Sequence, residues 1–578
     1  MVRYTADFET TTETGLIRDG FVRVWAVDVT NIDTCESVLT SNKIDDFFTW
    51  CENDGKSKEV YFHNLKFDGT FIIDWLFRNG YTYADDKPSE KSFTCLITDM
   101  GVWYEITIYH KVYNKRYVKT VIRDSLKKLP FSVRDISKAF NLETKKLTID
   151  YDAYREENYE LSDEENDYIH SDTKIVAEAL KIQFEKGLTK MTVGSDALSN
   201  FKDGVGKKGF KYLFPILDNT IDNDIRKSYK GGFVYLNPKY AGLELHNVIS
   251  FDVNSLYPSV MYDNPMPYGQ PKYYIGKYMY DEKYPLFIQS VNVDFDLKPD
   301  HIPTLQIKNS SRFVPTEYVT SSNGEMINLM LTSVDLALFL DQYDVHEIEY
   351  LEGFKFKQVK NLFKDYIDYW IEIKKASTGA MRTLAKLMLN SLYGKFGTNP
   401  RKCQLRPTYD KDKKQVIYKP MEETIEDSVY TALASFVTAY ARNKTIRTAQ
   451  SVYKHFIYAD TDSIHLVGTT YDEVAKLIDV HPKDLGKWGY EGEAVRAKFL
   501  RAKTYVKEKW TDALDEDGNP TGEKVLKLFV TCSGMPDECK AGVTFEDFKL
   551  GAKFGGKLQA KRVSGGTYMR SIVFTIKR

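Results

Sequence analysis

The hydrophobic pattern of residues 1–190 alternates between strand-like and helix-like spacing. Residues 24–30 (VWAVDVT) and 59–64 (EVYFHN) carry the β-branched and aromatic side chains typical of buried strands. Residues 163–186 place apolar side chains at helical spacing among polar ones. Strands that alternate with helices in this way indicate an α/β domain.

The pattern changes after this first domain. A Gly/Lys-rich passage at 202–211 is predicted to connect it to the next one. Residues 246–262 (HNVISFDVNSLYPSVMY) predict a buried strand that runs into a turn and the start of a helix. Residues 263–361 are rich in Tyr, Pro and short alternating runs, which predicts an inserted, mostly β element.

Helices and hairpins are predicted in the second half of the chain. Residues 362–396 are helical in pattern, with a Ser-Thr-Gly break at 377–379 that makes them a helical hairpin. The polar segment 399–427 predicts an exposed β-hairpin or loop. A helix is expected at 431–453, and residues 455–468 predict a hairpin with aspartates at its turn.

Length and composition are those of a multidomain globular protein. The 578 residues correspond to roughly four domains at about 150 residues each. With 80 Lys and Arg against 82 Asp and Glu, the chain cannot be a uniformly basic nucleic-acid coat protein, although local basic grooves remain compatible with this balance. Residues 548–578 carry basic side chains and no acidic ones, so this segment is either a solvated face or a phosphate contact.

Cysteine usage and hydropathy bear on the compartment. The six cysteines form no CxxC pair and no Cys/His metal spacing, so we expect a reducing compartment. The chain opens without an apolar signal-peptide core, and its longest apolar stretches fall short of the roughly 18 residues that a membrane span needs. We therefore expect an intracellular protein without a membrane partner.

Several carboxylates stand where metal-ion chemistry could use them. Asp7 and Glu9 lie two apart in a predicted strand and face the same side, and Asp460 and Asp462 share this geometry. Oxygen ligands of this kind hold hard divalent cations. Either pair alone is weak evidence, because acidic pairs at this spacing arise by chance in a chain with 82 acidic residues among 578.

Three further acidic residues occur in apolar surroundings. Asp252 ends the run VISF, Asp68 lies between YFHNLKF and GTFII, and Asp172 follows Tyr168 by four residues on one helix face. Each alone is more simply a helix cap, a turn residue or an ion-pair partner. Taken together, the carboxylates predict two separate clusters, one in each half of the chain.

The helix predicted at 380–396 supplies complementary cations. Its Lys386, Asn390, Tyr393 and Gly394 share one face at about 100° per residue. A Lys on such a face can grip a triphosphate while the Tyr ring stacks on a base. Lys374 and Arg382 lie on the same hairpin, and no GxxxxGK[ST] phosphate-binding loop occurs in the sequence.

The ordered set of motifs resembles the protein-primed family B DNA polymerases of the phi-twenty-nine-like bacteriophages, nearly end to end. The matching motifs are DFET (7–10), YFHNLKFDG (61–69), RDSLKKLPF (123–131), Tyr168-x-x-x-Asp172, YKGG (229–232), DVNSLYPS (252–259), KLMLNSLYGKF (386–396), ADTDS (459–463) and KTY (503–505). The sequence departs from the family pattern in a longer segment at 13–22, in Lys230 where Arg is usual and in Arg382 where Lys is usual.

The resemblance implies an α/β multidomain fold, with a ribonuclease-H-like exonuclease domain and a right-hand polymerase that carries two palm insertions. The implied segments are a 3′→5′ exonuclease (1–191), palm (192–262 and 428–532), a terminal-protein-region insertion (263–361), fingers (362–398), a second insertion for strand displacement and processivity (399–427) and thumb (533–578).

The resemblance also implies roles for individual residues of the exonuclease. Asp7, Glu9, Asp68 and Asp172 are expected to hold two Mg²⁺ ions, for which Mn²⁺ can substitute, while Tyr168 and Lys146 orient the attacking water and steady the phosphate. The residues expected to hold the frayed single strand are Tyr61, His63, Asn64, Phe67, Phe71, Ser125 and Leu126.

In the polymerase half, the resemblance implies that Asp252, Asp462 and the carbonyl of Val253 bind two more Mg²⁺ ions, with Asp460 close by. The expected dNTP-binding residues are Tyr257, Lys374, Arg382, Lys386, Asn390 and Tyr393, with Tyr257 selecting deoxynucleotides and Tyr393 stacking on the nascent pair. The expected DNA contacts are Tyr229, Gly231, Gly232, Gly394, Lys503 and Tyr505.

A phage-encoded, monomeric, strand-displacing enzyme in the cytoplasm of the infected cell is therefore the leading hypothesis. Its expected partners are primer-template DNA, single-stranded DNA, dNTPs and a terminal protein whose hydroxyl primes synthesis. Three alternatives stand beside it: a conventional nucleic-acid-primed replicase or repair polymerase, an inactive scaffold that only binds the terminal protein or single-stranded DNA, and a nuclease alone.

Overall fold

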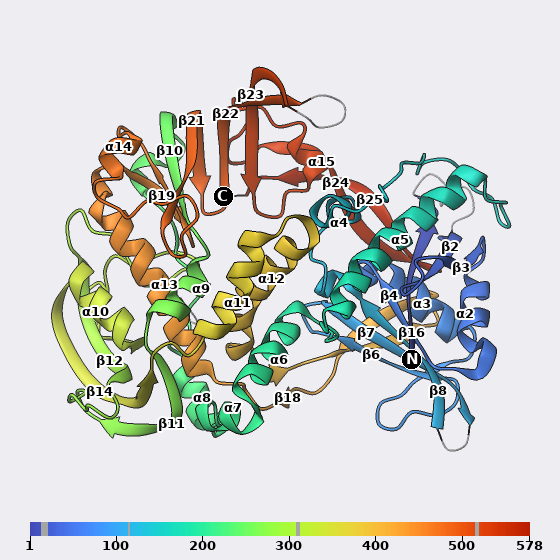
Figure 1. The fold of residues 1–578 in the computed structure, drawn as a ribbon, viewed down its shortest axis with the longest axis horizontal. Coiled ribbons are helices and arrows are strands. Elements are labelled where there is room, and N and C mark those ends of the chain that lie inside the picture. The colour runs from blue at the N-terminus through green and yellow to red at the C-terminus, as the bar shows by residue number, and fades with distance from the viewer. Residues whose placement is uncertain (13–20, 114–115, 308–312, 515–519, 578) are drawn as a thin grey trace.

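A computed structural model describes residues 1–12, 21–113, 116–307, 313–514 and 520–577 (Figure 1). Most of the long segment noted at 13–22 thus lies outside the described residues. Within the described ranges, the strands form sheets of eight, seven and four strands and three two-stranded sheets. Helices pack on and between these sheets, so the architecture is mixed α/β, and no described helix is long and apolar enough to cross a membrane.

The N-terminal sheet has the order β3-β2-β1-β4-β8-β7-β6-β5 among the described residues. β1 pairs parallel with β4 and antiparallel with β2, so the predicted strands at 24–30 and 59–64 are confirmed. The strands are β1 (Val2–Thr10), β2 (Val24–Asn31), β3 (Ser37–Ser41), β4 (Lys58–Phe62), β5 (Thr82–Tyr83), β6 (Ser92–Ile97), β7 (Trp103–Tyr113) and β8 (Arg116–Asp124). The accompanying helices are α2 (Ile44–Glu52), α3 (Leu65–Arg78), α4 (Val133–Phe140) and α5 (Asp163–Glu185).

Helix α5 covers β1 and β2 and confirms the helix predicted at 163–186. It begins with a capping box, in which the Ser162 hydroxyl accepts the Glu165 N–H and the Glu165 carboxylate accepts the Ser162 N–H. Its apolar residues, including Ile169 and Leu180, are buried. The cap and this apolar face together lay the middle of α5 across strand β1.

Residues 202–211, predicted to connect the first domain to the next, are largely helical. They end helix α6 (Val193–Val205) and form most of α7 (Lys207–Leu213), which is followed by α8 (Asn219–Arg226). The aromatic rings decide this outcome: Phe201 stacks on Phe363 with centroids 4.7 Å apart, and Phe210 is buried in the same cluster. Gly206, with φ of 74°, allows the sharp change of direction between α6 and α7.

The central sheet has the order β23-β22-β21-β10-β20-β19-β9 among the described residues. The predicted strand–turn–helix at 246–262 is confirmed as β10 and α9, the helix at 431–453 as α13, and the hairpin at 455–468 as β19 and β20. The elements are β9 (Val234–Leu236), β10 (Glu244–Val253), α9 (Leu256–Asp263), α13 (Thr431–Ser451), β19 (Phe456–Asp460), β20 (Ser463–Leu466), α14 (Tyr471–Val474), β21 (Trp488–Arg501), β22 (Thr504–Leu514) and β23 (Pro520–Cys532).

Between α9 and the next helical pair lies a four-stranded sheet with the order β11-β14-β12-β13, which confirms the mostly β character of 263–361. Its elements are β11 (Met266–Ile275), β12 (Leu286–Leu297), β13 (Ile327–Thr332), α10 (Ser333–Gln342) and β14 (Tyr343–Val359). The helical hairpin is confirmed as α11 (Lys364–Ala376) and α12 (Gly379–Phe396), with the break where it was predicted.

The hairpin predicted in 399–427 is confirmed, but its predicted exposure is only partly correct. Strands β15 (Arg401–Lys402) and β18 (Thr424–Ile425) pair at its base, and β16 (Leu405–Asp410) and β17 (Gln415–Pro420) form its arm. Val416 and Tyr418 of this arm pack on the N-terminal unit, Tyr418 edge-on to Trp103 at 5.5 Å. The arm therefore covers apolar side chains of the N-terminal unit, a contact that its polar sequence did not predict.

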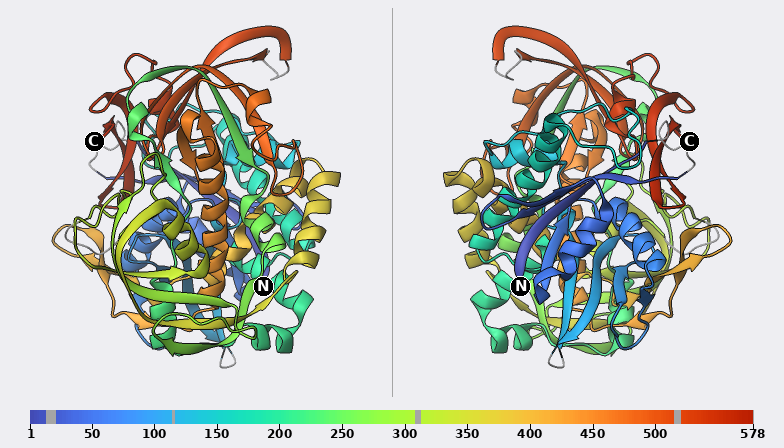
Figure 2. Two further views of the ribbon diagram at one scale, coloured as in Figure 1. Left: turned by 90° about the vertical axis from the view of Figure 1, so that its left-hand side faces the viewer. Right: turned by 90° about the vertical axis from the view of Figure 1, so that its right-hand side faces the viewer.

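The basic C-terminal segment forms the hairpin β24 (Lys553–Val563) and β25 (Gly566–Thr575) after the short helix α15 (Asp537–Lys540). Its turn contacts the N-terminal unit, where the Val22 N–H donates to the Ser564 carbonyl at 3.4 Å and Gly566 lies against Phe71. Arg562 lies over the Tyr418 ring at 4.3 Å. Figure 2 shows this red hairpin beside the blue strands, so parts of the chain that are distant in sequence meet here.

Candidate active sites

The first acidic cluster lies where β1, α3 and α5 meet. Asp7 and Glu9 project from β1 and Asp172 from α5, and the ligand oxygens of these three residues all lie within 4.8 Å of one another. Asp68, from the first turn of α3, lines the same cavity, which has a volume of about 400 Å³. The predicted gathering of carboxylates in the N-terminal half is thus seen in the structure.

These carboxyls resist ionisation. Burial, then Asp172, raises the pKa of Asp7 to about 7. Burial and the neighbouring Asp7 carboxylate raise the pKa values of Glu9 and Asp68 well above their ordinary range. Among the described residues, Oδ1 of Asp68 and Oδ1 of Asp172 are buried without a hydrogen-bond partner. Unpaired oxygens in a cluster of repelling carboxylates fit a hard divalent cation.

A lysine and two tyrosines border this cluster. Lys146 Nζ contacts Asp172 Oδ2 and donates to the Tyr168 hydroxyl at 3.1 Å. Tyr168 also shares a short hydrogen bond with the hydroxyl of Tyr151, which is half exposed. Lys146 thus leaves the second oxygen of Asp172 free to face the cavity. Sequence reasoning missed Tyr151, because the surrounding DYDAY has no periodicity that would place it.

The residues expected to hold a single strand divide into two groups. His63, Asn64 and Phe67 line the cavity. Ser125 is buried behind it, with its hydroxyl 2.9 Å from His63 Nδ1, and Leu126 is half-buried in the same short helix, Ser125–Lys127.

Tyr61 and Phe71, also predicted to contact the single strand, do not line this cavity. Tyr61 is 1% exposed, and its hydroxyl donates to Glu59 at 3.0 Å. Its ring packs against Phe184 with centroids 5.7 Å apart. Phe71 is also 1% exposed, because Gly566 of β25 covers it. Both rings are buried in this structure, and their contact with a single strand stays a prediction.

The second acidic cluster lies where neighbouring strands of the central sheet end. Asp252 is near the end of β10, Asp460 ends β19, and Asp462 stands in the tight turn before β20. Strand β20 pairs with β19 on one side and with β10 on the other. Its residue Ser463 stands opposite Asp460 of β19 and opposite Asp252 of β10. The Val253 N–H donates to the Asp462 carbonyl at 2.7 Å, which ties the turn to β10.

Burial and neighbouring carboxylates raise the pKa values of two carboxyls in this cluster. Burial, then Asp462 and Glu491, raises the pKa of Asp252 to about 7, while Lys386 opposes the shift. Burial and Asp460 raise the pKa of Asp462. Asp460 is already paired, because Lys503 Nζ lies 2.7 Å from its Oδ1. Asp252 and Asp462 are therefore the candidate carboxylates for a metal ion at this cluster. Sequence reasoning missed Glu491, which only the pairing of β21 with β10 brings near.

Two of the three predicted cations of the helical hairpin face a neighbouring cavity of about 650 Å³, which Lys386 does not line. Lys374 and Arg382 line it together with Ser255 and the loop residues His481 and Lys483. Lys374 Nζ donates to the Ser255 hydroxyl at 3.0 Å. Burial, then Arg382 and Lys386, lowers the pKa of Lys374, because like charges converge on this space. Such a cavity is suited to a polyanion.

The remaining residues predicted to contact nucleotide or DNA are mainly tyrosines and glycines. Tyr257 and Tyr393 stack with centroids 4.1 Å apart. A side chain on Gly232 would lie 2.8 Å from Thr461, in the turn between the two aspartates. The Tyr229 ring packs on Gly397. The remaining predicted contacts are placed as follows: Asn390 and Gly394 are exposed on α12, the Gly231 carbonyl accepts from Arg442 at 2.8 Å, and Tyr505 packs on Tyr458 at 5.3 Å.

Comparison with known proteins gives one consistent answer. The profile of the family "DNA polymerase type B, organellar and viral" matches residues 51–158 and 154–478. The DNA polymerase of Bacillus phage phi29 is 46% identical over 580 residues, covering 99% of each chain, and that of Streptococcus phage Cp-1 is 36% identical over 593 residues, covering 99% of this chain and 98% of the other.

Solved structures agree with the sequence matches. Phi29 DNA polymerase complexed with primer-template DNA superposes with a TM-score of 0.93 at 44% identity, and its complex with single-stranded DNA with a TM-score of 0.92 at 43% identity. Each covers 100% of both chains. The chain therefore belongs to the type B DNA polymerases of organelles and viruses, and within them to the phi29-like DNA polymerases.

Proposed function

We propose that this DNA polymerase builds strands at the cluster around Asp252 and Asp462 and removes nucleotides in the 3′→5′ direction at the cluster around Asp7 and Glu9. The observation that carries the proposal is the presence of two separate acidic clusters with raised pKa values, each bordered by lysine. In Figure 1 the strands β10 and β19 lie on the far side of α11 and α12 from α5. Two chemistries can thus proceed at separate places.

At the building site, Asp252, Asp462 and the Val253 carbonyl would hold two Mg²⁺ ions, and Asp7, Glu9, Asp68 and Asp172 two more at the degrading site. When bound, such ions activate the attacking hydroxyl or water and neutralise charge on the leaving oxygen, and Mn²⁺ can replace them. Lys374, Arg382 and Lys386 bind the triphosphate of the incoming dNTP, in keeping with the cavity that two of them line.

Other side chains position the substrates. Tyr257 closes the sugar pocket against a 2′-hydroxyl, and Tyr393, held against it, stacks on the nascent base pair. Lys503 and Tyr505 hold the primer end, next to Asp460. In the degrading site, His63, Asn64 and Phe67 hold the frayed strand, while Lys146 and Tyr168 orient water and steady the phosphate.

The solved phi29 enzyme complexed with primer-template DNA, with incoming nucleotide and with single-stranded DNA supports these substrates for the present chain. We assign palm, fingers and thumb to the central sheet with α9 and α13, to α11–α12, and to residues 533–578. The sheet of 263–361 is proposed to bind a terminal protein that serves as primer. The hairpin of 399–427 is proposed to support strand displacement.

The test is primer extension past a double-stranded block, with Mg²⁺, with Mn²⁺ and with a chelator. Asp252→Ala should lower incorporation by more than about 1,000-fold and leave degradation of single-stranded DNA intact. Asp7→Ala combined with Glu9→Ala should do the reverse. Normal extension by the first variant, or normal degradation by the second, would refute the corresponding site.

The alternative of a nucleic-acid-primed polymerase makes a different prediction for residues 399–427. Since β15 and β18 pair at the base of this hairpin, its arm can be replaced by a short linker between them. Our proposal predicts that the shortened protein still adds single nucleotides but loses strand displacement and makes short products. Unchanged displacement would favour the alternative. A nuclease alone is already disfavoured, because the polymerase family profile extends over residues 154–478.

A further inference from the structure

Behind the degrading cluster lies a buried carboxylate that the reaction does not use. Asp28 on β2 stands directly opposite Asp7 on β1 in the antiparallel register, so both side chains point toward the sheet face that α5 covers. Unlike Asp7, Asp28 does not line the cavity and its side chain is 0% exposed. A carboxylate in that position needs a full set of donors.

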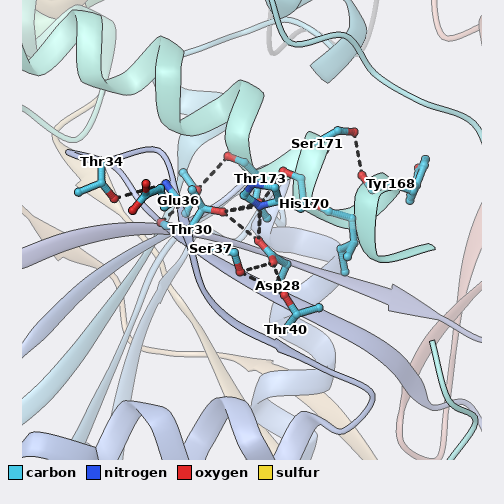
Figure 3. Close-up of polar contacts among 12 residues, drawn as sticks. Asp28, Thr30, Thr34, Glu36, Ser37, Thr40, Tyr168, His170, Ser171 and Thr173 are labelled. Carbon is cyan, nitrogen blue, oxygen red and sulfur yellow. Dashed lines mark hydrogen bonds and ion pairs between the residues drawn. The ribbon is translucent and has the colours of Figure 1, made fainter. Parts of the chain in front are cut away.

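Hydroxyl groups from three elements supply those donors, as Figure 3 shows. Asp28 Oδ1 accepts from Ser37 at 2.7 Å and from Thr40 at 2.9 Å, both on the β3 side. Asp28 Oδ2 accepts from Thr30 at 2.9 Å and from Thr173 of α5 at 2.6 Å. His170 Nδ1, one turn earlier on α5, lies 3.6 Å from the same oxygen.

Thr173 is therefore held by both strands. Its hydroxyl contacts Asp28 and, at 2.9 Å, the Thr30 hydroxyl on β2. Its carbonyl accepts from the Thr5 hydroxyl on β1, also at 2.9 Å. The residue before it in the chain is Asp172, the α5 member of the acidic cluster.

The apolar contacts between α5 and the sheet do not fix the helix along its axis, because hydrophobic burial has no direction. Hydrogen bonds at a buried carboxylate do have direction. A shift of α5 by even a fraction of a turn would break the bond from the Thr173 hydroxyl to Asp28 and the bond from the Thr5 hydroxyl to the Thr173 carbonyl. Asp28 Oδ2 would then keep Thr30 as its hydroxyl donor, and the Thr173 hydroxyl would keep only the carbonyls of its own helix. Only one position of α5 satisfies every partner. In that position one carboxylate oxygen of Asp172 lies within 4.8 Å of one oxygen of Asp7 and one of Glu9.

We propose that Asp28 and Thr173 are positioning residues of the degrading centre, which hold Asp172 at the distance from Asp7 and Glu9 that a shared divalent cation requires. The inference rests on the proposed 3′→5′ activity of this cluster. It assigns a role in metal affinity to Asp28, which does not line the cavity, and to Thr173 at the cavity wall. This role is like that of outer-shell partners that orient metal ligands.

Two substitutions at one position test the idea. Thr173→Val keeps the shape but removes the hydroxyl, whereas Thr173→Ser keeps the hydroxyl. Thr40→Val is the control for stability alone, because it removes another Asp28 donor that does not reach α5. Mn²⁺ binding is followed by electron paramagnetic resonance in full-length protein that also carries Asp252→Asn and Asp462→Asn, so that the N-terminal cluster supplies the signal.

We expect Thr173→Val to weaken Mn²⁺ binding roughly 10-fold to 100-fold relative to Thr173→Ser and Thr40→Val, and to raise the metal requirement for degradation equally. Extension, measured without the two Asn substitutions, should be unchanged. Equal binding by Thr173→Val and Thr173→Ser, or an equal loss in Thr40→Val, overturns the proposal. Should Thr173→Val fail to fold, Thr5→Val against Thr5→Ser tests the other hydrogen bond to Thr173 with the same expected contrast.

The proposed activity and this inference fail in different ways. If Asp7→Ala with Glu9→Ala still degrades single strands, the assignment of the cluster itself is wrong. If that double variant is inactive while Thr173→Val binds Mn²⁺ normally, the cluster is the nuclease centre and only the positioning role is wrong.

Discussion

Tyr257 of α9 and Tyr393 of α12 stack face to face, with ring centroids 4.1 Å apart and planes inclined by 24°. The first ring stands four residues after Val253 and the second on the helical hairpin that carries Lys386. This contact joins α9, which follows the strand that bears Asp252, to the helix that bears Arg382 and Lys386, two of the cations proposed to bind the triphosphate. It also limits the rotation of Tyr257, which suits a ring that must present a rigid wall to a sugar.

Replacing Tyr257 by Val should therefore admit ribonucleotides. The expected result is a rise of at least about tenfold in the ratio of ribonucleotide to deoxynucleotide incorporation, because a smaller side chain leaves room for the 2′-hydroxyl. Steady-state incorporation of a matched NTP and dNTP pair measures it. Tyr257→Phe, which keeps the ring, should discriminate normally, and unchanged selection by the Val variant would exclude the sugar-gate role.

Metal binding and pH should be coupled through Asp7 and Asp252, whose pKa values are both raised to about 7, chiefly by burial. Between about pH 4 and about pH 7 the folded, metal-free protein holds protons that the unfolded chain has released. Its free energy of unfolding should therefore fall as pH rises through this interval. Mg²⁺ requires the ionised carboxylates, so the stabilisation that it provides should grow over the same interval.

Thermal unfolding with a chelator and with Mg²⁺, compared at about pH 6 and about pH 8, measures this coupling. The increase in midpoint caused by Mg²⁺ should be larger at the higher pH. A protein with Asp7→Asn and Asp252→Asn should lose most of this difference. An equal increase at both pH values in the unsubstituted protein would contradict the coupling.

Much of this arrangement was predictable from sequence because the signals are local. Alternation at 24–30, the break at 377–379 and the apolar flanks of Asp460 and Asp462 depend on neighbours in the chain, and each led to the correct element. The pairing of Asp7 with Glu9 on one strand face also needed only the two-residue period of a strand.

What the sequence did not reveal depends on partners distant in the chain. Tyr61 and Phe71 are predicted to contact the single strand because of the motif around them. In the structure, Phe184 packs on Tyr61 and Gly566 lies against Phe71. The passage at 202–211 has the composition of a linker, but Phe201 and Phe210 fold it onto the aromatic core. Asp28 lies among apolar strand residues with no motif, and its role emerges only when α5 brings Thr173 to it.

Two neighbouring glycines should differ sharply in their tolerance of a side chain. A Cβ on Gly232 would lie 2.8 Å from Thr461 and 3.1 Å from the Tyr257 hydroxyl, whereas a Cβ on Gly231 would meet nothing within 4 Å. Gly232→Ala should thus displace the turn between Asp460 and Asp462. We expect it to lower single-nucleotide incorporation by about tenfold or more, since small shifts of catalytic groups are costly.

Gly231→Ala is the matched control, with the same chemical change in open space. It should incorporate single nucleotides at a rate close to that of the unsubstituted protein, and both variants should degrade single strands normally. If the two alanine variants extend primers equally, the close contact at Gly232 has no part in shaping the polymerase centre.

The turn of the C-terminal hairpin offers a second glycine pair. Gly565 has a φ of 91°, and a Cβ on it would lie 2.2 Å from the Val22 carbonyl oxygen. Gly565→Ala should therefore open the contact between this hairpin and the N-terminal unit. If that contact helps to keep DNA enclosed, products made in one binding event should shorten several-fold, while addition of a single nucleotide is retained because the catalytic carboxylates lie elsewhere. Gly555→Ala in β24, where a Cβ meets nothing within 4 Å, provides the comparison. Extension in the presence of excess competitor DNA measures product length, and equal lengths for both variants would show that this contact does not contribute to processivity.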